Sequence, residues 1–222
     1  MVEVSTSVLN IDKKNAISKF YDLEKAHTDY FHIDVMDGKF TDNNTYELMK
    51  DYATTIKQIT NIPLDVHFMT YFVKENIEQY IGLEPNIVTF HYEAVESKEE
   101  IFEVIKYIKE NNARVGIAIK PKTDIEKILE FLPYVHLVLV MTVEPGYGGQ
   151  ELIPETIEKV KKLKKYIDEN NLEVDIEVDG GIKTENSKKV KEAGATILAS
   201  GSGIIKSNDY KKTIEKLKND IE

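Results

Sequence analysis

Six ionisable residues alternate with apolar residues near the ends of three predicted β-strands. Residues two apart on a strand point to the same face of its sheet. The same-face pairs are His32 and Asp34, Asp65 and His67, and Glu177 and Asp179. Ionisable groups on an apolar strand lower stability unless they are paired or bind a metal ion. The spacing therefore indicates that the ends of these strands carry a functional site.

Four of these side chains would supply two imidazoles and two carboxylates around one point if the strands converge. They are His32, Asp34, His67 and Asp179. This set suits one divalent ion, such as zinc, iron, manganese or cobalt, with positions left open for a substrate. One aspartate could then remove a proton beside a carbonyl while the other returns a proton to the opposite face. That chemistry is an epimerisation without an organic cofactor; the alternative is that each residue is a hydrogen-bonded polar group of the core.

Three glycine-rich loops follow the last three predicted strands. Loops of this kind offer backbone N–H groups to a phosphate. They contain Gly146, Tyr147, Gly148 and Gly149, then Gly180 and Gly181, and finally Gly201 and Ser202. Because Arg114 is the only arginine, a phosphate site has to rely on these N–H groups or on lysine. The first loop, taken alone, could equally be an ordinary turn.

Three methionines and one further histidine also fall at strand ends. Met36, Met69 and Met141 would form an apolar, polarisable lining of the site, although ordinary core filling is the simpler explanation for each one. His91 closes the fourth predicted strand and is a candidate for a further ligand or for a support of a ligand.

Short β-branched runs alternate with segments of helical period along the whole chain. The eight predicted strands are Glu3–Val8, Tyr30–Met36, Leu64–Met69, Ile87–Phe90, Arg114–Ile119, Val135–Thr142, Val174–Val178 and Thr196–Ser200. Helical periodicity is clearest over Glu155–Asn170, and capping-box spacing at Ser97 with Glu100 and at Thr123 with Glu126 predicts two helix starts. Eight strand–helix units predict a single domain over residues 1–222, folded as a closed (β/α)8 TIM barrel. An open doubly wound sheet is the alternative.

The composition of the chain argues against several classes of binding partner. The 222 residues contain no cysteine and carry a net charge of −10, which argues against nucleic acid and anionic membranes as main partners. No signal peptide and no apolar stretch of about 20 residues is visible, so we expect a cytoplasmic protein. We expect a small-molecule substrate and leave a homo-oligomer open.

Several motifs resemble those of the ribulose-phosphate 3-epimerase family, whose members are metal-dependent (β/α)8 barrels of the ribulose-phosphate-binding type. Among them are His-Ile-Asp-Val-Met-Asp-Gly at 32–38, Met-Thr-Val-Glu-Pro-Gly-Tyr-Gly-Gly-Gln at 141–150 and Glu-Val-Asp-Gly-Gly-Ile at 177–182. The matching stretches run in order from Ser5 to Ile204.

The resemblance implies interconversion of D-ribulose 5-phosphate and D-xylulose 5-phosphate in the pentose phosphate pathway. It assigns metal binding to the four-residue set above, proton transfer to Asp34 and Asp179, and substrate contacts to Ser7, His67, the three methionines and the glycine loops. The loop Lys39–Asn43 departs from the family pattern and bears on substrate choice. A ketohexose-phosphate 3-epimerase of the same mechanism and a non-catalytic sugar-phosphate-binding barrel are the alternatives.

Overall fold

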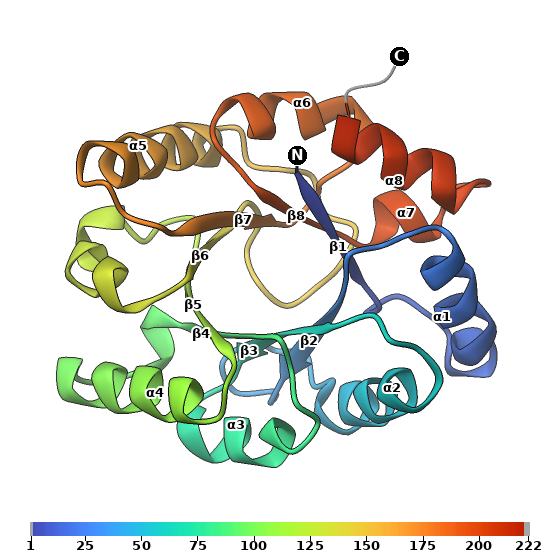
Figure 1. Cartoon of the computed structure of the whole chain (residues 1–222), viewed down its shortest axis with the longest axis horizontal. Helices are drawn as coiled ribbons and strands as arrows, with labels where there is room; N and C mark the ends of the chain where they lie inside the picture. Colours follow the sequence, from blue (N-terminus) through green and yellow to red (C-terminus); the bar gives the residue numbers. More distant parts are fainter. Residues whose placement is uncertain (1, 220–222) are drawn as a thin grey trace.

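The computed structural model describes residues 2–219 and contains a closed barrel of eight parallel strands in sequence order (Figure 1). The strands are β1 (Glu3–Ser7), β2 (Tyr30–Met36), β3 (Leu64–Met69), β4 (Ile87–His91), β5 (Arg114–Ile119), β6 (Leu137–Met141), β7 (Asp175–Asp179) and β8 (Ile197–Ser200). Pairing of β1 with β8 closes the ring, so the predicted barrel is confirmed and the open sheet is excluded. The predicted strand ends differ from the observed ones by no more than two residues; β4 and β7 extend to include His91 and Asp179.

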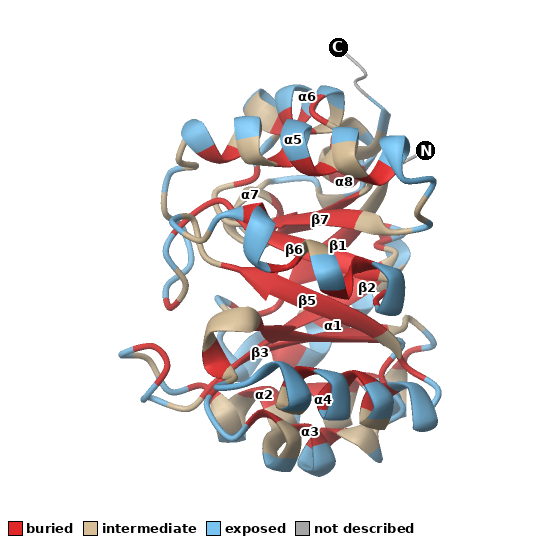
Figure 2. Ribbon diagram, turned by 90° about the vertical axis from the view of Figure 1, so that its left-hand side faces the viewer, coloured by how far each residue is buried: buried red, intermediate tan, exposed pale blue. Residues whose placement is uncertain are grey.

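Helices cover the outside of this barrel. The α-helices are α1 (Ala16–Lys25), α2 (Tyr46–Ile59), α3 (Val73–Ile81), α4 (Lys98–Glu110), α5 (Glu155–Glu169), α6 (Thr184–Glu192), α7 (Ser202–Ile205) and α8 (Tyr210–Asn219). Short 3-10 turns are η1 (Lys13–Asn15), η2 (Tyr92–Ala94), η3 (Ile125–Lys127) and η4 (Leu129–Tyr134). Figure 2 shows buried strands between helices that are exposed on their outer sides. No helix within residues 2–219 is long and apolar enough to cross a bilayer.

Of the two predicted helix starts, one is confirmed and one is wrong. The Ser97 side chain accepts the Glu100 N–H at 3.2 Å and begins α4. Thr123, in contrast, donates its hydroxyl to Glu93, and the segment after it forms only η3 and η4. Pro133 lies inside η4, and a proline ring removes a backbone donor and disfavours α-helix in the residue before it. Between β5 and β6 the chain forms these 3-10 turns and no α-helix.

The interior of the barrel is divided between polar and apolar side chains. Ile87, Ala118, Leu137, Leu139 and Ile197 belong to one buried apolar cluster. The parallel register aligns Asp34 with His67, and Met141 with Asp179, so these side chains reach the same level at the carboxyl ends of the strands. This end of a (β/α)8 barrel is where such folds carry their sites.

Candidate functional site

Two imidazoles and two carboxylates meet at the carboxyl end of the barrel. His32 and Asp34 come from β2, His67 from β3 and Asp179 from β7, and their ligand atoms all lie within 4.8 Å of one another. Oδ1 of Asp34 is 3.3 Å from Nε2 of His32 and 3.6 Å from Nδ1 of His67. Oδ2 of Asp179 is 3.9 and 3.8 Å from the same two nitrogens. The structure therefore brings together the four residues that the sequence singled out.

The donor atoms of this cluster fit a divalent cation. Nε2 of His32 and Nδ1 of His67 are buried and have no hydrogen-bond partner within the described part of the chain. A buried polar atom without a partner lowers stability unless something else binds it. Two imidazole nitrogens and two carboxylates are ligands that zinc, iron, manganese and cobalt accept. The cluster is thus a candidate metal centre.

Three buried side chains support His32 from the interior of the barrel. Its Nδ1 is 2.6 Å from Oδ2 of Asp65, which also accepts the hydroxyl of Ser5 at 2.7 Å. Glu177 lies 3.4 Å from the same nitrogen, and both of its oxygens are buried without a hydrogen-bond partner. Burial alone would lower the pKa of His32, but the carboxylates of Asp65 and Asp34 raise it well above its usual value. Asp65 therefore orients the ring so that Nε2 faces the candidate metal centre.

The second imidazole has a different neighbour. Nε2 of His67 is 3.0 Å from Nε2 of His91, and the two rings stack with centroids 5.0 Å apart. His91 therefore contacts a candidate ligand and lies outside the four-residue cluster. Burial lowers the pKa of His67 to about 4, which leaves this ring neutral at neutral pH.

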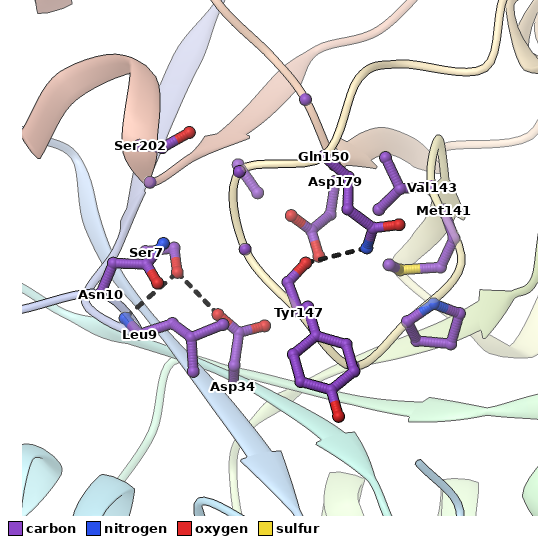
Figure 3. A pocket seen from close by; sticks show the side chains of 18 of the residues that line it. Ser7, Leu9, Asn10, Asp34, Met141, Val143, Tyr147, Gln150, Asp179 and Ser202 are labelled. Atoms are coloured by element: carbon purple, nitrogen blue, oxygen red, sulfur yellow. Dashed lines mark hydrogen bonds between the residues drawn. The ribbon is translucent and has the colours of Figure 1, made fainter. Parts of the chain in front are cut away.

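The two aspartates have opposite electrostatic environments. Burial would raise the pKa of Asp34, but His32 and His67 hold it well below its usual value. Burial and the neighbouring Asp34 carboxylate instead raise the pKa of Asp179 to about 7. Ser7 donates its hydroxyl to Oδ2 of Asp34 at 2.7 Å (Figure 3). Carboxyl groups whose pKa values are pushed apart are suited to serve as a base and an acid in one reaction.

A pocket opens above these carboxylates. The residues that the sequence predicted and that line it are Ser7, Asp34, Met36, Met69, Met141, Gly146, Tyr147, Gly148, Gly149, Asp179, Gly180, Gly181, Gly201 and Ser202. His67, also predicted to contact substrate, is fully buried and is not among the lining residues of the described chain. Figure 3 shows Asp34 and Asp179 pointing into the pocket from different sides. The lining also includes Asn10, Val143 and Gln150, to which the sequence assigned no role, although the last two lie in the motif at 141–150.

The loops around the pocket depend on glycine at two positions in particular. Gly180 and Gly181 follow Asp179 with φ values of +118° and +67°, which side chains other than glycine rarely adopt. A Cβ at Gly181 would also overlap the backbone near Leu152. The chain therefore turns sharply just after Asp179 and leaves backbone groups facing the pocket.

Of three supporting carboxylates, the sequence placed Asp65 and Glu177 on inner faces without assigning them a role, and it missed Glu93. Asp65 and Glu177 share strand faces with His67 and Asp179, so their two-residue spacing already placed them inside the barrel. Glu93 lies in η2, just beyond β4, where its Oε2 is 3.0 Å from Nδ1 of His91. No strand alternation could have found Glu93, because it follows the end of the strand.

Known proteins resemble this chain along almost its whole length. The model of the ribulose-phosphate 3 epimerase family matches residues 3–205. A ribulose-phosphate 3-epimerase from Methanocaldococcus jannaschii is 36% identical over 98% of this chain and 90% of its own length. The Bacillus subtilis enzyme of the same name is 34% identical over 98% and 99%.

Solved structures share the architecture at lower sequence identity. The 3-hexulose-6-phosphate synthase from Salmonella typhimurium superposes with a TM-score of 0.70 at 16% identity, covering 97% of this chain and 96% of its own. KGPDC from Streptococcus mutans gives a TM-score of 0.72 at 10% identity over 98% and 96%. These two similarities support the barrel fold alone. The family model and the sequence relatives, in contrast, agree on one family. The chain belongs to the ribulose-phosphate 3-epimerase family.

Proposed function

We propose that this protein is a metal-dependent epimerase that interconverts D-ribulose 5-phosphate and D-xylulose 5-phosphate. The observation that carries the proposal is the placement of Asp34 and Asp179, which come from β2 and β7, separated in the ring by β1 and β8, and meet at one pocket. Inversion at a carbon needs a base on one face and an acid on the other. The family membership and the names of the sequence relatives support the choice of substrate.

In this proposal, one aspartate removes the proton at C3 as the C–H bond electrons move toward the C2 carbonyl. The other aspartate delivers a proton to the opposite face of C3, and the roles reverse for the return reaction. The opposite pKa shifts of Asp34 and Asp179 support it, because one carboxyl is ionised and the other near half-protonated at neutral pH. The Ser7 hydroxyl holds Asp34 by its Oδ2 and leaves Oδ1 toward the two histidines.

We assign the candidate metal centre to one divalent ion held by His32, Asp34, His67 and Asp179. When bound, such an ion would polarise the substrate carbonyl and stabilise negative charge on its oxygen. The phosphate is assigned to the backbone N–H groups of the glycine loops that line the pocket. The methionines at the strand ends would exclude water from the reacting carbon.

A deuterium-exchange experiment tests the proposal. The protein is incubated with D-ribulose 5-phosphate in D2O, and C3 is followed by NMR with and without a chelator. We expect deuterium at C3 together with xylulose 5-phosphate, loss of both on chelation, and recovery when metal is restored. No exchange after metal reloading would overturn the assignment of the pentulose substrate. Exchange with a six-carbon ketose phosphate would then favour the ketohexose-phosphate 3-epimerase, and exchange with neither sugar would favour the non-catalytic binding barrel.

An aspartate substitution tests the two-base step. Asp179→Asn removes one acid/base group without changing size, and we expect kcat to fall about 100- to 10,000-fold. Asp175→Asn is the matched control, because Asp175 begins the same strand and pairs with Arg114 at the opposite end of the barrel. A near wild-type kcat for Asp179→Asn would contradict proton transfer by this residue.

A further inference from the structure

A line of hydrogen-bonding groups runs outward from the candidate metal centre. Nε2 of His67 is 3.0 Å from Nε2 of His91, whose Nδ1 is 3.0 Å from Oε2 of Glu93. Both rings are fully buried, and the Glu93 side chain is 19% exposed. None of these contacts belongs to the pocket in which a substrate would bind. The line therefore reaches the candidate metal centre through His67.

The protonation of Glu93 decides how protons are arranged along this line. Burial would raise its pKa, but the hydrogen bonds from His91, from Thr123 and from the Lys120 N–H bring the pKa down to about 2. An ionised carboxylate accepts hydrogen bonds and cannot donate one. Nδ1 of His91 must therefore carry the proton that Oε2 of Glu93 accepts.

The same reasoning passes through the two rings. A neutral imidazole has one N–H, so a protonated Nδ1 leaves Nε2 of His91 as an acceptor. Nε2 of His67 must then be the donor across the 3.0 Å contact. This tautomer leaves a lone pair on Nδ1 of His67, the buried atom without a hydrogen-bond partner that faces Asp34 and Asp179. With the opposite arrangement, Nδ1 would carry a proton and could not bind a cation.

Glu93 is itself held in a fixed orientation. Its Oε1 accepts the Lys120 N–H at 2.8 Å and the Thr123 hydroxyl. Lys120 and Thr123 belong to the loop after β5. Nζ of Lys159 on α5 anchors this loop by donating to the carbonyls of Lys120, Pro121 and Thr123 at 3.0, 2.7 and 2.5 Å. The Glu93 carboxylate therefore cannot rotate away from His91 without breaking its hydrogen bonds to Lys120 and Thr123.

We propose that Glu93 is a positioning residue that selects, through His91, the tautomer of His67 in which Nδ1 is free to bind the metal. The inference rests on the proposed assignment of His67 as a ligand, but it concerns a proton position that exists before any metal binds. Glu93 touches neither the substrate pocket nor the four candidate ligands.

Glu93→Gln is the informative variant because the Lys120 N–H can only donate. The Lys120 N–H therefore binds the oxygen of the amide at position 93, and the NH2 of that amide faces Nδ1 of His91. His91 then has to donate from Nε2, and the proton of His67 moves to Nδ1. Glu96→Gln is the matched control, since it makes the same charge change at an exposed position three residues away.

Two measurements follow the change. Histidine 15N NMR of the metal-free protein reports which nitrogen of His67 and His91 carries hydrogen. Zn2+ titration against a competing chelator reports affinity. In wild type and Glu96→Gln we expect hydrogen on Nε2 of His67. In Glu93→Gln we expect it on Nδ1, with Zn2+ affinity lower by about 10- to 100-fold.

An unchanged His67 tautomer in Glu93→Gln overturns the inference. So does a wild-type spectrum with the proton already on Nδ1 of His67, which needs no variant and stands even if Glu93→Gln fails to fold. Failure of the epimerase proposal looks different, because it shows as absent C3 exchange in metal-loaded wild type while the tautomer remains measurable.

Discussion

The two histidines of the candidate metal centre are oriented in contrasting ways. His32 is held by Asp65 and Ser5, which lie on neighbouring strands in the fully buried interior of the barrel. His67 is held through His91 by Glu93, which lies beyond the strand end and is partly exposed. The first support is part of the folded core, whereas the second stands on loops around it. Changes to the first should therefore affect folding most, and changes to the second should affect the proton arrangement with less effect on the barrel.

Removal of Asp65 should have the largest effect on stability. Asp65→Ala leaves the Nδ1–H of His32 and the Ser5 hydroxyl without their acceptor inside the barrel. Loss of one partner of a buried ion pair typically costs about 3–5 kcal/mol. Urea unfolding of the metal-free protein measures this change, and Asp65→Asn, which retains an acceptor oxygen, should lose less. A loss for Asp65→Ala no larger than that for Glu93→Gln would break the contrast between the two supports.

Stability should also depend on the ionisation of Glu93, with a smaller effect. At neutral pH we expect wild type to exceed Glu93→Gln by about 2 kcal/mol, the value of buried hydrogen bonds to a charged group. The folded pKa of about 2 lies below the usual 4.5, so the unfolded chain binds the proton first as the pH falls. The difference should therefore shrink as pH drops from about 4.5 toward 2. Urea midpoints across this range measure it, and a difference that stays constant or grows would contradict an ionised Glu93.

The same contrast explains what could be predicted from the sequence. The supports of His32 lie on strands, where two-residue alternation assigns Asp65 and Glu177 to the inner face. The register of parallel strands then pairs Asp34 with His67 and Met141 with Asp179 at the carboxyl end of the barrel, which eight repeated units anticipate. The barrel and its inner residues were therefore accessible to pattern reasoning.

The outer support was not accessible in this way. Glu93 reaches His91 from a 3-10 turn and depends on Lys120 and Thr123, about 30 residues further along the chain. Thr123 has the spacing of a helix cap, yet its hydroxyl bonds Glu93 instead, because tertiary contacts override a local preference. Loop geometry of this kind depends on contacts between distant segments, and no periodic signal encodes it.

The loops after β2 and β6, which lie over the pocket, offer a further comparison with the two histidine supports. A change there should have the smallest effect of the variants considered. The Asn43 side chain donates to the Gly146 carbonyl at 3.1 Å and joins the loop after β2 to the loop after β6. Neither partner of this contact belongs to a histidine support, so Asn43→Ala should leave Zn2+ affinity nearly unchanged and lower the unfolding free energy by no more than about 1 kcal/mol. A lost hydrogen bond of about 1 kcal/mol corresponds to roughly a 5-fold rise in KM for D-ribulose 5-phosphate under the proposed function. Asp42→Ala, at the neighbouring exposed position, is the control.

Steady-state kinetics and Zn2+ titration of the same preparations decide between two views of these loops. If they only enclose the substrate, Asn43→Ala raises KM while kcat and Zn2+ affinity stay at wild-type values. If Zn2+ affinity falls as well, the loops belong to the outer support of His67. Phe40 provides a physical route to that outcome, because it lies in the same loop as Asn43. The centroid of its ring is 4.8 Å from the centroid of the His91 ring. A change in Asn43 would then reach the metal centre through the imidazole that Glu93 orients.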